Sequence, residues 1–270
     1  MTTNRDRIHP SAIISPEAEL PEDIRIGPFA VIDGHVKIGA GSVIQAHAHL
    51  IGPLTMGCNN QVYPNAVLGG RPQHACYKDE PTNLEIGDAN IFREAVTIHR
   101  GTTASMTTKI GNGNTFMCGS HVGHDCVVGN RCTLVNNSLL GGHCVLDDGV
   151  IVSGNAAVHQ FCRLGRLCLL SGNSATSKDM PPFITQRGLN MVSGLNLVGM
   201  RRGGLTLPQI NGMRRLFQIV YGQKLTVTNA LAKAEAELGH IDAVMEFIAF
   251  VRASKRGING MREELSELAA

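Results

Sequence analysis

The chain has 270 residues, of which 43% are hydrophobic, 17% charged and 4% aromatic, and its formal net charge is +2. So little charge argues against a disordered chain or a coiled coil, and a net charge near zero gives no reason to expect nucleic acid as a partner. The apolar runs are too short to span a bilayer, and residues 1–7 lack the apolar stretch of a signal peptide, so we expect a cytoplasmic protein without a membrane span. The 31 glycines and the absence of tryptophan favour a narrow, repetitive interior with many tight corners.

From the N-terminus onward, an apolar residue recurs every six positions. Eleven consecutive members run from Ile8 to Leu68, and eleven more run from Ile110 to Leu170. A glycine often follows the apolar residue, and a small residue stands four positions after it. This is the hexapeptide pattern of a parallel β-helix, in which three hexads form one triangular coil of about 18 residues and the coils stack at the inter-strand spacing of about 4.8 Å.

The period is interrupted by two segments that we interpret as external loops. The first, residues 70–83, contains Arg71-Pro-Gln-His-Ala-Cys-Tyr, and the second, residues 101–109, is rich in threonine. Excursions from a solenoid usually lie on its functional face, so we expect both loops near a site.

Five of the eight cysteines fall in the column of small inward residues: Cys126, Cys132, Cys144, Cys162 and Cys168. The chain contains no CxxC pair, and a cytoplasmic context disfavours disulfides. We therefore interpret these cysteines as small buried hydrophobic residues, not as metal ligands or disulfide partners.

Several histidines differ from the cysteines, because they lie outside the inward columns at spacings close to multiples of the coil length. With two polar neighbours, they are expected along one edge of the prism: His121, His124, Asp125, His143, His159 and Gln160. Imidazoles that converge beside a carboxylate form either a metal site or a proton-transfer site, since histidine titrates near neutral pH. The alternative is a polar edge that only faces solvent.

The hexapeptide pattern stops near Pro181-Pro182, and the periodicity then becomes helical. Thr206 followed by Pro208 is a typical helix start. We predict three or four helices and divide the chain into a β-helix domain, residues 1–182, and a helical domain, residues 183–270. These helices would cap the open end of the solenoid, whose strand edges are otherwise unpaired.

Seven segments of the chain are similar to those of one family. They are Val96-Thr-Ile-His-Arg-Gly-Thr, His121-Val-Gly-His-Asp-Cys, Gly141-Gly-His, Ala157-Val-His-Gln-Phe-Cys, Asp179-Met-Pro-Pro, Gly194-Leu-Asn-Leu-Val-Gly-Met-Arg-Arg and Ser254-Lys-Arg-Gly. On these segments the chain resembles, over nearly its whole length, the acyl-carrier-protein:UDP-N-acetylglucosamine O-acyltransferases of lipid A biosynthesis. The resemblance implies a left-handed β-helix and a homotrimer with active sites between subunits.

The resemblance also implies the reaction: an (R)-3-hydroxyacyl group passes from acyl carrier protein to the 3-hydroxyl of the glucosamine ring. It implies no metal, and no cofactor beyond the phosphopantetheine of the acyl donor. It makes His124 the general base and places Gly172 at the far end of the acyl groove, open to long chains. The residues that it implies at the sugar-nucleotide and acyl site are His121, His143, His159, Gln160, Gln73 and Tyr77. Asn196 and Arg202 would reach the nucleotide.

The residue types suit this chemistry independently of the resemblance. A sugar hydroxyl is a poor nucleophile at neutral pH, so a base must remove its proton, and Asp125 could stabilise the resulting His124 imidazolium. Gly142 is expected one coil above His124 and is our candidate for the backbone N–H that stabilises the oxyanion. The arginine pairs 201–202 and 214–215 could meet the diphosphate or the acidic carrier protein; the alternative is a solvated helix face.

Two positions of the first loop depart from the family pattern. Where the family usually has Gln-Asp-Leu-Lys-Tyr, this chain has Gln73-His-Ala-Cys-Tyr77, so His74 and Cys76 replace an Asp and a Lys that help to hold the acceptor sugar. Either Lys78 supplies the missing charge, or the acceptor differs and carries, for example, a 3-amino group instead of the 3-hydroxyl.

Three other functions stay open at this point. A γ-class carbonic anhydrase also uses a left-handed β-helix and holds zinc with three histidines, for which His121, His124 and His143 are available. The second is a hexapeptide acyltransferase that acts on a different sugar nucleotide. The third is a non-catalytic binding or scaffold solenoid, which would leave the histidine edge unexplained.

Overall fold

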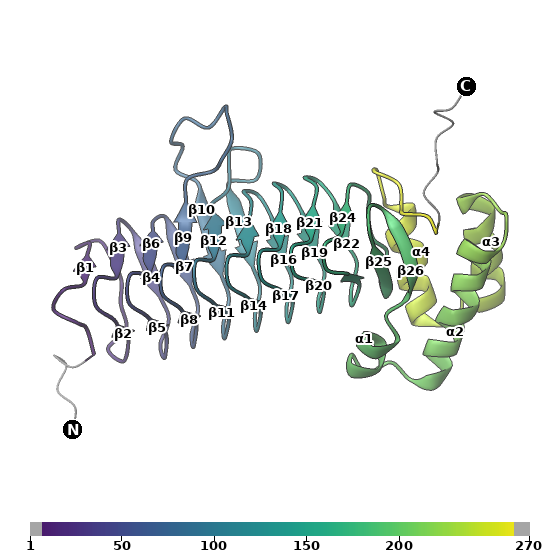
Figure 1. The fold of residues 1–270 in the computed structure, drawn as a ribbon, viewed down its shortest axis with the longest axis horizontal. Helices are drawn as coiled ribbons and strands as arrows, with labels where there is room; N and C mark the ends of the chain where they lie inside the picture. The colour runs from purple at the N-terminus through teal and green to yellow at the C-terminus, as the bar shows by residue number, and fades with distance from the viewer. Residues whose placement is uncertain (1–6, 262–270) are drawn as a thin grey trace.

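The computed structural model describes residues 7–261, which form a long triangular solenoid of parallel strands followed by a group of helices (Figure 1). Most of the segment on which the expected absence of a signal peptide rests, residues 1–6, lies outside the described residues, as does the end of the predicted helical domain, residues 262–270. Within the described residues, no helix combines the length and the apolar character that crossing a bilayer requires.

Three sheets form the faces of the prism, and we number them 1 to 3. Sheet 1 contains β1 (Ile13–Ile14), β3 (Val31–Asp33), β6 (His49–Ile51), β9 (Val67–Gly70), β12 (Thr97–His99), β15 (His121–Val122), β18 (Leu139–Leu140), β21 (Ala157–Val158) and β24 (Ala175–Thr176). Sheet 2 contains β4 (Val36–Ile38), β7 (Leu54–Met56), β10 (Asn83–Ile86), β13 (Thr107–Ile110), β16 (Val127–Val128), β19 (Val145–Leu146) and β22 (Arg163–Leu164). Sheet 3 contains β2 (Arg25–Ile26), β5 (Val43–Ile44), β8 (Gln61–Val62), β11 (Ile91–Phe92), β14 (Thr115–Phe116), β17 (Thr133–Leu134), β20 (Ile151–Val152), β23 (Leu169–Leu170), β25 (Ile184–Arg187) and β26 (Met191–Leu195).

The predicted coil length sets the strand register. In sheet 1, His121 lies opposite Leu139 and Leu139 lies opposite Ala157, so equivalent positions of successive coils are neighbours. The second loop leaves the coil without disturbing this register, because Thr97 still pairs with His121, whereas the pairing of β9 with β12 across the first loop shifts between Ile98 and His99. The first loop joins β9 to β10 and the second joins β12 to β13, and both project from the same side of the solenoid (Figure 1). The second loop is shorter than predicted, since β13 already begins at Thr107.

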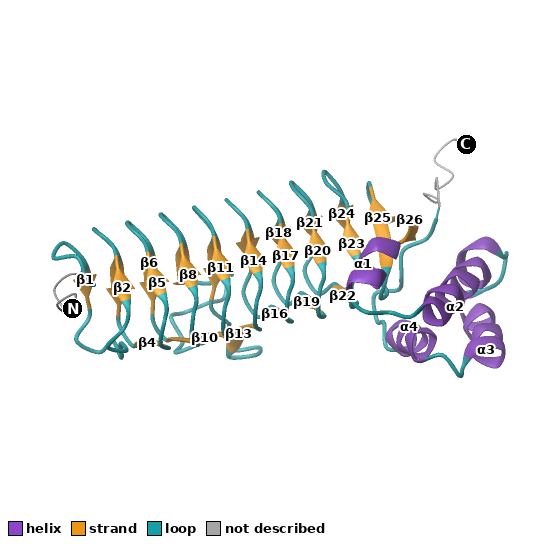
Figure 2. Cartoon of the chain, turned by 90° about the horizontal axis from the view of Figure 1, so that it is seen from below, coloured by secondary structure: helices purple, strands orange, loops and turns teal. Residues whose placement is uncertain are grey.

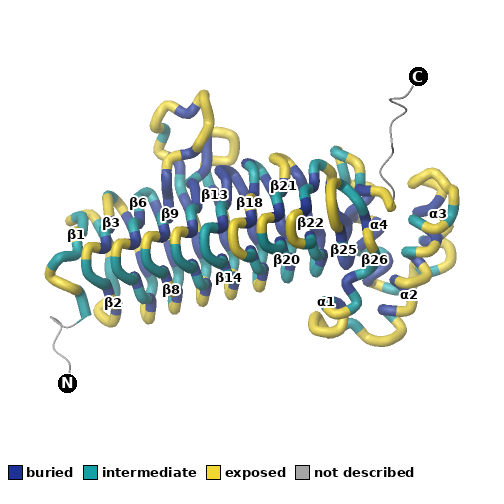
Figure 3. Tube along the Cα trace, in the orientation of Figure 1, coloured by how far each residue is buried: buried dark blue, intermediate teal, exposed yellow. Residues whose placement is uncertain are grey.

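The interior confirms the inward columns. Every apolar member of the second hexapeptide run is buried: Ile110, Phe116, Val122, Val128, Leu134, Leu140, Leu146, Val152, Val158, Leu164 and Leu170. The five inward cysteines are buried, as predicted, and each is present as a free thiol. Burial raises the pKa of the Cys132 thiol to about 12, so this residue behaves as a neutral hydrophobic side chain. Figure 3 shows how buried and exposed residues alternate along the coils.

The prediction that helical structure directly follows Pro182 is wrong, because β25 and β26 come first. β25 pairs in parallel with β23 and continues sheet 3, and β26 pairs with β25 in antiparallel fashion. The apolar period does not reveal this coil, since Gln186 stands opposite Leu170 at the inward position. Gln186 is fully buried and donates a hydrogen bond to the carbonyl of Ala175, which makes a polar residue tolerable there.

The helical part of the chain begins beside the last coils with its first helix and continues beyond them (Figure 2). Its elements are α1 (Leu197–Arg202), α2 (Leu207–Phe217) with a π-helical turn at Gln218–Gly222, α3 (Val227–Leu238) and α4 (Asp242–Arg252). Thr206 caps α2 in a capping box with Gln209, which confirms the predicted helix start. The helices share a second hydrophobic core with Phe183 and Ile184 of the last coil, and Arg166 of the solenoid pairs with Glu246 of α4 at 2.6 Å.

Candidate active site

The candidate active site lies on the edge where sheet 1 turns into sheet 2. His124 and Asp125 stand in the turn after β15, His143 in the turn after β18, and Phe161 in the turn after β21. Asp125, His143 and Phe161 have positive φ angles of 61°, 61° and 67°. The same sharp corner recurs in each coil, so side chains at this position leave the core and stack along one edge.

An open cavity of about 490 Å³ borders these turns. Its lining comes from both the coils and the first loop: Gln73, His99, His121, Gly123, His124, Leu139, Leu140, Gly141, Gly142 and Gln160. The structure therefore brings together five residues that we predicted for the site: Gln73, His121, His124, Gly142 and Gln160. In this cavity, polar side chains converge beside the apolar residues Leu139 and Leu140, as in many small-molecule sites.

His124 and Asp125 form a hydrogen-bonded pair. The Nδ1 atom of His124 lies 2.7 Å from Oδ2 of Asp125, and Nε2 of His143 lies 3.6 Å from the same oxygen. The His124 side chain is 10% exposed and the Asp125 side chain is 0% exposed. His124 leaves the core as predicted, but the alternative of a solvent-facing edge is wrong here, because the ring of His74 in the first loop covers His124 with its centre 5.1 Å away.

The carboxylate of Asp125 is fully hydrogen-bonded. Oδ1 accepts hydrogen bonds from the backbone N–H of Thr102 at 2.8 Å and the hydroxyl of Ser105 at 2.5 Å, and Oδ2 accepts one from the Thr102 hydroxyl at 2.7 Å. Burial alone would raise the pKa of Asp125, but the hydrogen bonds outweigh burial and lower this pKa to about 2. An ionised Asp125 favours the Nδ1–H tautomer of His124 and leaves Nε2 as the proton acceptor.

Ligand-type atoms of His124, Asp125 and His143 lie close enough together for one metal ion to contact all three. The hydrogen bonds do not suit such an ion, because each carboxylate oxygen of Asp125 already accepts two and Nδ1 of His124 is engaged with Oδ2. His121, the further ligand that the carbonic anhydrase hypothesis needs, has its Nδ1 2.8 Å from the Thr97 hydroxyl. The residues fit proton transfer better than zinc coordination.

Gly142 packs against the imidazole of His124, one coil above it as predicted. A Cβ atom at position 142 would lie 2.6 Å from Cε1, 2.8 Å from Nε2 and 3.1 Å from Nδ1 of His124, so only glycine fits. Among the described residues, no acceptor is hydrogen-bonded to the Gly142 N–H, which leaves that group free for a ligand.

His99 is a cavity residue to which the sequence analysis assigned no role. Its ring lies edge-on to His121 with the centres 4.7 Å apart. Burial, together with the neighbouring His121 and His124, lowers the pKa of His99 to about 4, and its buried Nδ1 has no hydrogen-bond partner among the described residues. The strand register could have identified His99. Once the second loop is left out of the count, Thr97 takes the position of His121 one coil earlier, so His99, two residues after Thr97, lies beside the strand that carries His121.

Phe161 is a second residue that the sequence analysis assigned no role. Its ring stacks on His143 at 4.5 Å with an angle of 9° between the planes, and His143 lies edge-on to His124 at 5.1 Å. Burial lowers the pKa of His143, and the nearby Asp125 opposes this shift. His159 is exposed, and its Nδ1 lies 3.4 Å from a guanidinium nitrogen of Arg256. The rings that lie against His124 are those of His143 and His74.

Tyr77, expected at the substrate, lies away from the cavity lining. It is 6% exposed; its hydroxyl donates to the carbonyl of Glu80 at 2.7 Å and accepts from Nε of Arg100 at 3.1 Å. Arg100 also donates to the carbonyl of Gly52. Tyr77 therefore fixes the first loop to the solenoid, while Gln73 of the same loop reaches the cavity.

Asn196 and Arg202 line a different cavity of about 310 Å³, between α1 and the edge of sheet 3. The side chain of Asn196 caps α1, since it accepts from the N–H of Gly199 and donates to the carbonyl of Leu167. The two cavities share no lining residue among those described. Within one chain, these two predicted nucleotide contacts are not brought to His124.

Gly172 is exposed in the turn before β24, on the edge of sheet 1 opposite to that of His124. A Cβ atom there would contact only the carbonyl oxygen of Gly154, at 3.4 Å. The separation of Gly172 from His124 is not a whole number of coils, so Gly172 is displaced around the prism as well as along it. A groove joining them must cross the outer face of sheet 1 as it rises.

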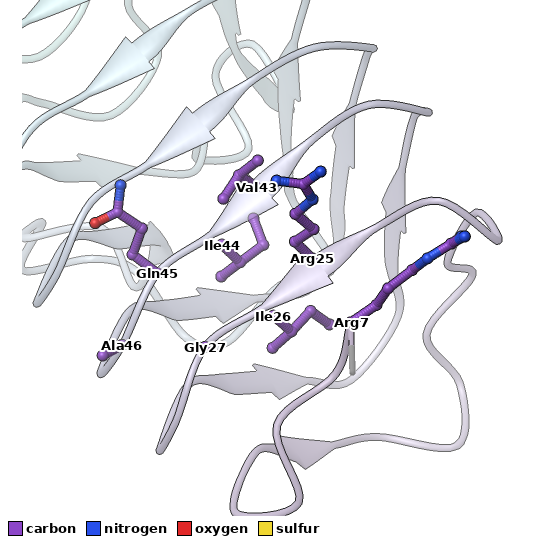
Figure 4. A pocket seen from close by; sticks show the side chains of 8 residues that line it. All are labelled: Arg7, Arg25, Ile26, Gly27, Val43, Ile44, Gln45 and Ala46. Carbon is purple, nitrogen blue, oxygen red and sulfur yellow. The ribbon is translucent and has the colours of Figure 1, made fainter. Parts of the chain in front are cut away.

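A larger hollow of about 630 Å³ lies on sheet 3 near the N-terminal end (Figure 4). Its described lining residues are Arg7, Arg25, Ile26, Gly27, Val43, Ile44, Gln45 and Ala46. Neither an imidazole nor a carboxylate lines it, so it offers no general base, and its size does not make it the candidate site.

Comparison with known proteins identifies the family of the chain. Residues 179–259 match the family described as Udp N-acetylglucosamine O-acyltransferase, domain 2, and residues 107–142 match bacterial transferase hexapeptide (six repeats). The acyl-[acyl-carrier-protein]–UDP-N-acetylglucosamine O-acyltransferase of Saccharophagus degradans is 46% identical over 93% of this chain and 98% of its own. The chain belongs to this acyltransferase family. The protein of the same name from Anaeromyxobacter sp. is 44% identical over 93% of this chain and 98% of its own.

Solved structures of this acyltransferase family have the same fold. The UDP-N-acetylglucosamine acyltransferase of Bacteroides fragilis 9343 is 40% identical and has a TM-score of 0.90, covering 93% of this chain and 99% of that one. The fold is thus the left-handed parallel β-helix with C-terminal helices that the resemblance implied. Membership of the family also settles the choice between an acyltransferase, a carbonic anhydrase and a scaffold in favour of the acyltransferase.

Proposed function

We propose that this acyltransferase transfers an (R)-3-hydroxyacyl group from acyl carrier protein to the 3-hydroxyl of UDP-N-acetylglucosamine, the first step of lipid A biosynthesis, in the cytoplasm. The observation that carries the proposal is the buried His124–Asp125 pair, which borders the cavity against Gly142. A pair of this kind supplies a base whose tautomer is fixed before substrate arrives.

In the proposed reaction, Nε2 of His124 takes the proton of the sugar hydroxyl while its oxygen attacks the thioester carbonyl carbon. Asp125 stabilises the imidazolium that forms, and the N–H of Gly142 donates to the oxyanion of the tetrahedral intermediate. The intermediate then collapses, the carbon–sulfur bond breaks, and the imidazolium returns its proton to the leaving phosphopantetheine thiolate. His124 thereby ends the cycle in its starting state.

The proposed assembly is a homotrimer whose sites lie between subunits. Its support is that Asn196 and Arg202 line a cavity separate from that of His124 within one chain. In a closed ring of three copies, every subunit presents the same pair of surfaces, so the cavity of one copy can face the histidine edge of the next. The nucleotide would then contact Arg202 of one subunit and the sugar would reach His124 of another.

Mixed trimers test this arrangement. His124→Ala and Arg202→Ala subunits, each inactive alone, are coexpressed in equal amounts; every mixed trimer then contains one intact site, and about a quarter of wild-type activity returns. His124→Ala mixed with Asp125→Asn is the matched control and stays inactive, because both groups come from one chain. Equal recovery in both mixtures, or none in either, contradicts the shared site. Light scattering should give three times the chain mass of 28.8 kDa.

The direct test of function is transfer by the purified protein between 3-hydroxyacyl carrier proteins of several lengths and UDP-N-acetylglucosamine. We expect UDP-3-O-acyl product by mass spectrometry, which His124→Ala no longer forms at a comparable rate. Failure of wild-type protein to form product with every donor length overturns the proposal.

A second candidate acceptor, the 3-amino analogue of the sugar nucleotide, is favoured by one observation. Residue 74 is a histidine whose ring contacts His124, where the resembling family has an aspartate. An aspartate at position 74 would favour the protonated form of the acceptor's 3-amino group, and a protonated amine cannot attack a thioester. A neutral imidazole at this position does not favour protonation of the amine. The test compares kcat/KM for the two acceptors in wild type and in His74→Asp/Cys76→Lys, which restores the family residues and should shift preference toward the hydroxyl.

A further inference from the structure

The second loop contributes more to the site than its position outside the coil suggests. Three of the hydrogen bonds to the Asp125 carboxylate come from this loop: the Thr102 N–H, the Thr102 hydroxyl and the Ser105 hydroxyl. Among the described residues, the coil itself contributes one more, that of His124. A fifth contact holds the backbone, since the N–H of Asp125 donates to Thr108 at the start of β13.

The conformation of the second loop directs the Thr102 and Ser105 donors toward Asp125. The Thr102 carbonyl accepts from the N–H of Met106 at 2.7 Å, which closes the loop into a tight turn beneath Ser105. The Ser105 hydroxyl has two acceptors within reach, Asp125 Oδ1 at 2.5 Å and the Thr107 carbonyl at 3.0 Å. The carboxylate is the shorter contact and the charged one, so it is the stronger acceptor.

We propose that Thr102 and Ser105 are positioning residues for the general base: they hold the Asp125 carboxylate ionised and aimed at Nδ1 of His124, so that the second loop sets the state of His124. This inference rests on the proposed role of His124 as the base. The physical reason is that a carboxylate removed from water must replace its hydration with protein donors, and a buried anion without them is unstable. The neighbouring N–H groups of the coil have other acceptors, since that of Asp125 donates to Thr108 and that of His143 to the carbonyl of His124.

The direction of the effect on acid–base behaviour follows from charge. The titratable groups facing the pair are His74 from the first loop, His143 from the next coil, and His99 and His121 from sheet 1. Among the described residues, none of these histidines is hydrogen-bonded to Thr102 or Ser105. Loss of a donor makes Asp125 more basic, and the His124–Asp125 pair then takes up its first proton at a higher pH. The acid limb of the kcat/KM profile therefore moves to higher pH.

The experiment uses Thr102→Val, Ser105→Ala and the double variant, with Thr102→Ser as the conservative variant and Thr103→Ala as the matched loop control. Thr103 is exposed in the same loop and makes no side-chain hydrogen bond among the described residues. We expect kcat to fall about tenfold for each hydroxyl removed, with the acid limb shifted upward and KM for either substrate little changed. Thr102→Ser should retain wild-type kcat and the wild-type acid limb.

A second readout needs no substrate. The ¹⁵N shifts of His124 report its tautomer and its titration midpoint, which should rise in the double variant and not in Thr103→Ala. An unchanged midpoint together with wild-type kcat overturns the inference, and so does an equal loss of kcat in Thr103→Ala. If wild-type protein transfers no acyl group but the His124 midpoint still moves, the proposed function fails while the positioning role stands.

Discussion

Replacement of Gly142 by alanine tests the core of the site with one methyl group. The added Cβ atom would lie 2.6 Å from Cε1 and 2.8 Å from Nε2 of His124, whereas ordinary carbon contacts are about 3.5–4.0 Å. The backbone of Gly142 belongs to a coil locked between its neighbours, so the imidazole must give way. It has to move by roughly 1 Å, away from the position in which Nδ1 meets Asp125.

The expected cost follows from that displacement. A shift of about 1 Å in a reacting group can lower a rate by about 10²-fold, and the Gly142 N–H is itself retained in the variant. We therefore expect kcat to fall about 10²-fold with little change in KM for either substrate. The stability cost should be small, because His124 lies at the border of an open cavity and can rotate toward it.

Gly154→Ala is the matched control for this prediction. Gly154 occupies the same turn position two hexads later, but a Cβ atom there would meet only the carbonyl oxygen of Asn136 at 3.5 Å and Val135 at 3.7 Å, which are ordinary contacts. The assay is single-turnover acyl transfer followed by mass spectrometry, with Tm measured for both variants. Wild-type kcat in Gly142→Ala would refute the placement of His124 as the base, and an equal loss in Gly154→Ala would show a general effect on the coils.

Three further predictions concern the base, pH and chain length. His124→Ala should lower kcat by about 10²–10⁴ with Tm within a few degrees of wild type; near wild-type kcat would contradict its role. His99, whose pKa is depressed from 6.5 to about 4, binds fewer protons in the folded state, so stability falls by about 3 kcal/mol as pH drops from 6.5 to 4. Denaturant titrations at several pH values should show His99→Gln with a flatter profile than wild type, and parallel profiles would exclude this origin. Gly172→Met should shift acyl preference toward shorter chains, by about fourfold in a competition assay per methylene excluded at about 0.8 kcal/mol; an unchanged ratio would place the end of the groove elsewhere.

The hexapeptide period was enough to predict the solenoid, its inward columns and the edge that carries His124. A period-six pattern is informative because each coil repeats the same three faces, so position in the hexad determines burial. The last coil escaped prediction for the same reason: Gln186 replaces the apolar residue, and hydrogen bonding to Ala175 compensates for it. Where a polar side chain is satisfied inside the core, hydropathy alone cannot show the coil.

The loops limit what the repeat could predict about the site. Period-six counting carries no information inside an excursion, so Thr102 and Ser105 could not be placed on Asp125 from the sequence. Tyr77 is a second example, since its hydroxyl is bonded to Glu80 and Arg100, contacts that the resemblance to the family did not predict. Residues in loops acquire their partners from tertiary contacts, which the local pattern does not determine.

Aromatic side chains stand at the corners of more than one edge of the prism. Phe29 and His47 have positive φ angles of 57° and 59° at the edge between sheets 3 and 1, and their rings stack with the centres 5.2 Å apart. Phe161 and His143 repeat this arrangement on the histidine edge, with φ angles of 67° and 61° and ring centres 4.5 Å apart. A bulky residue in this conformation is strained by roughly 1–3 kcal/mol, so strain occurs on both edges and does not by itself mark the functional one. What distinguishes the histidine edge is that its stacked pair lies against His124, whose ring is hydrogen-bonded to a buried carboxylate.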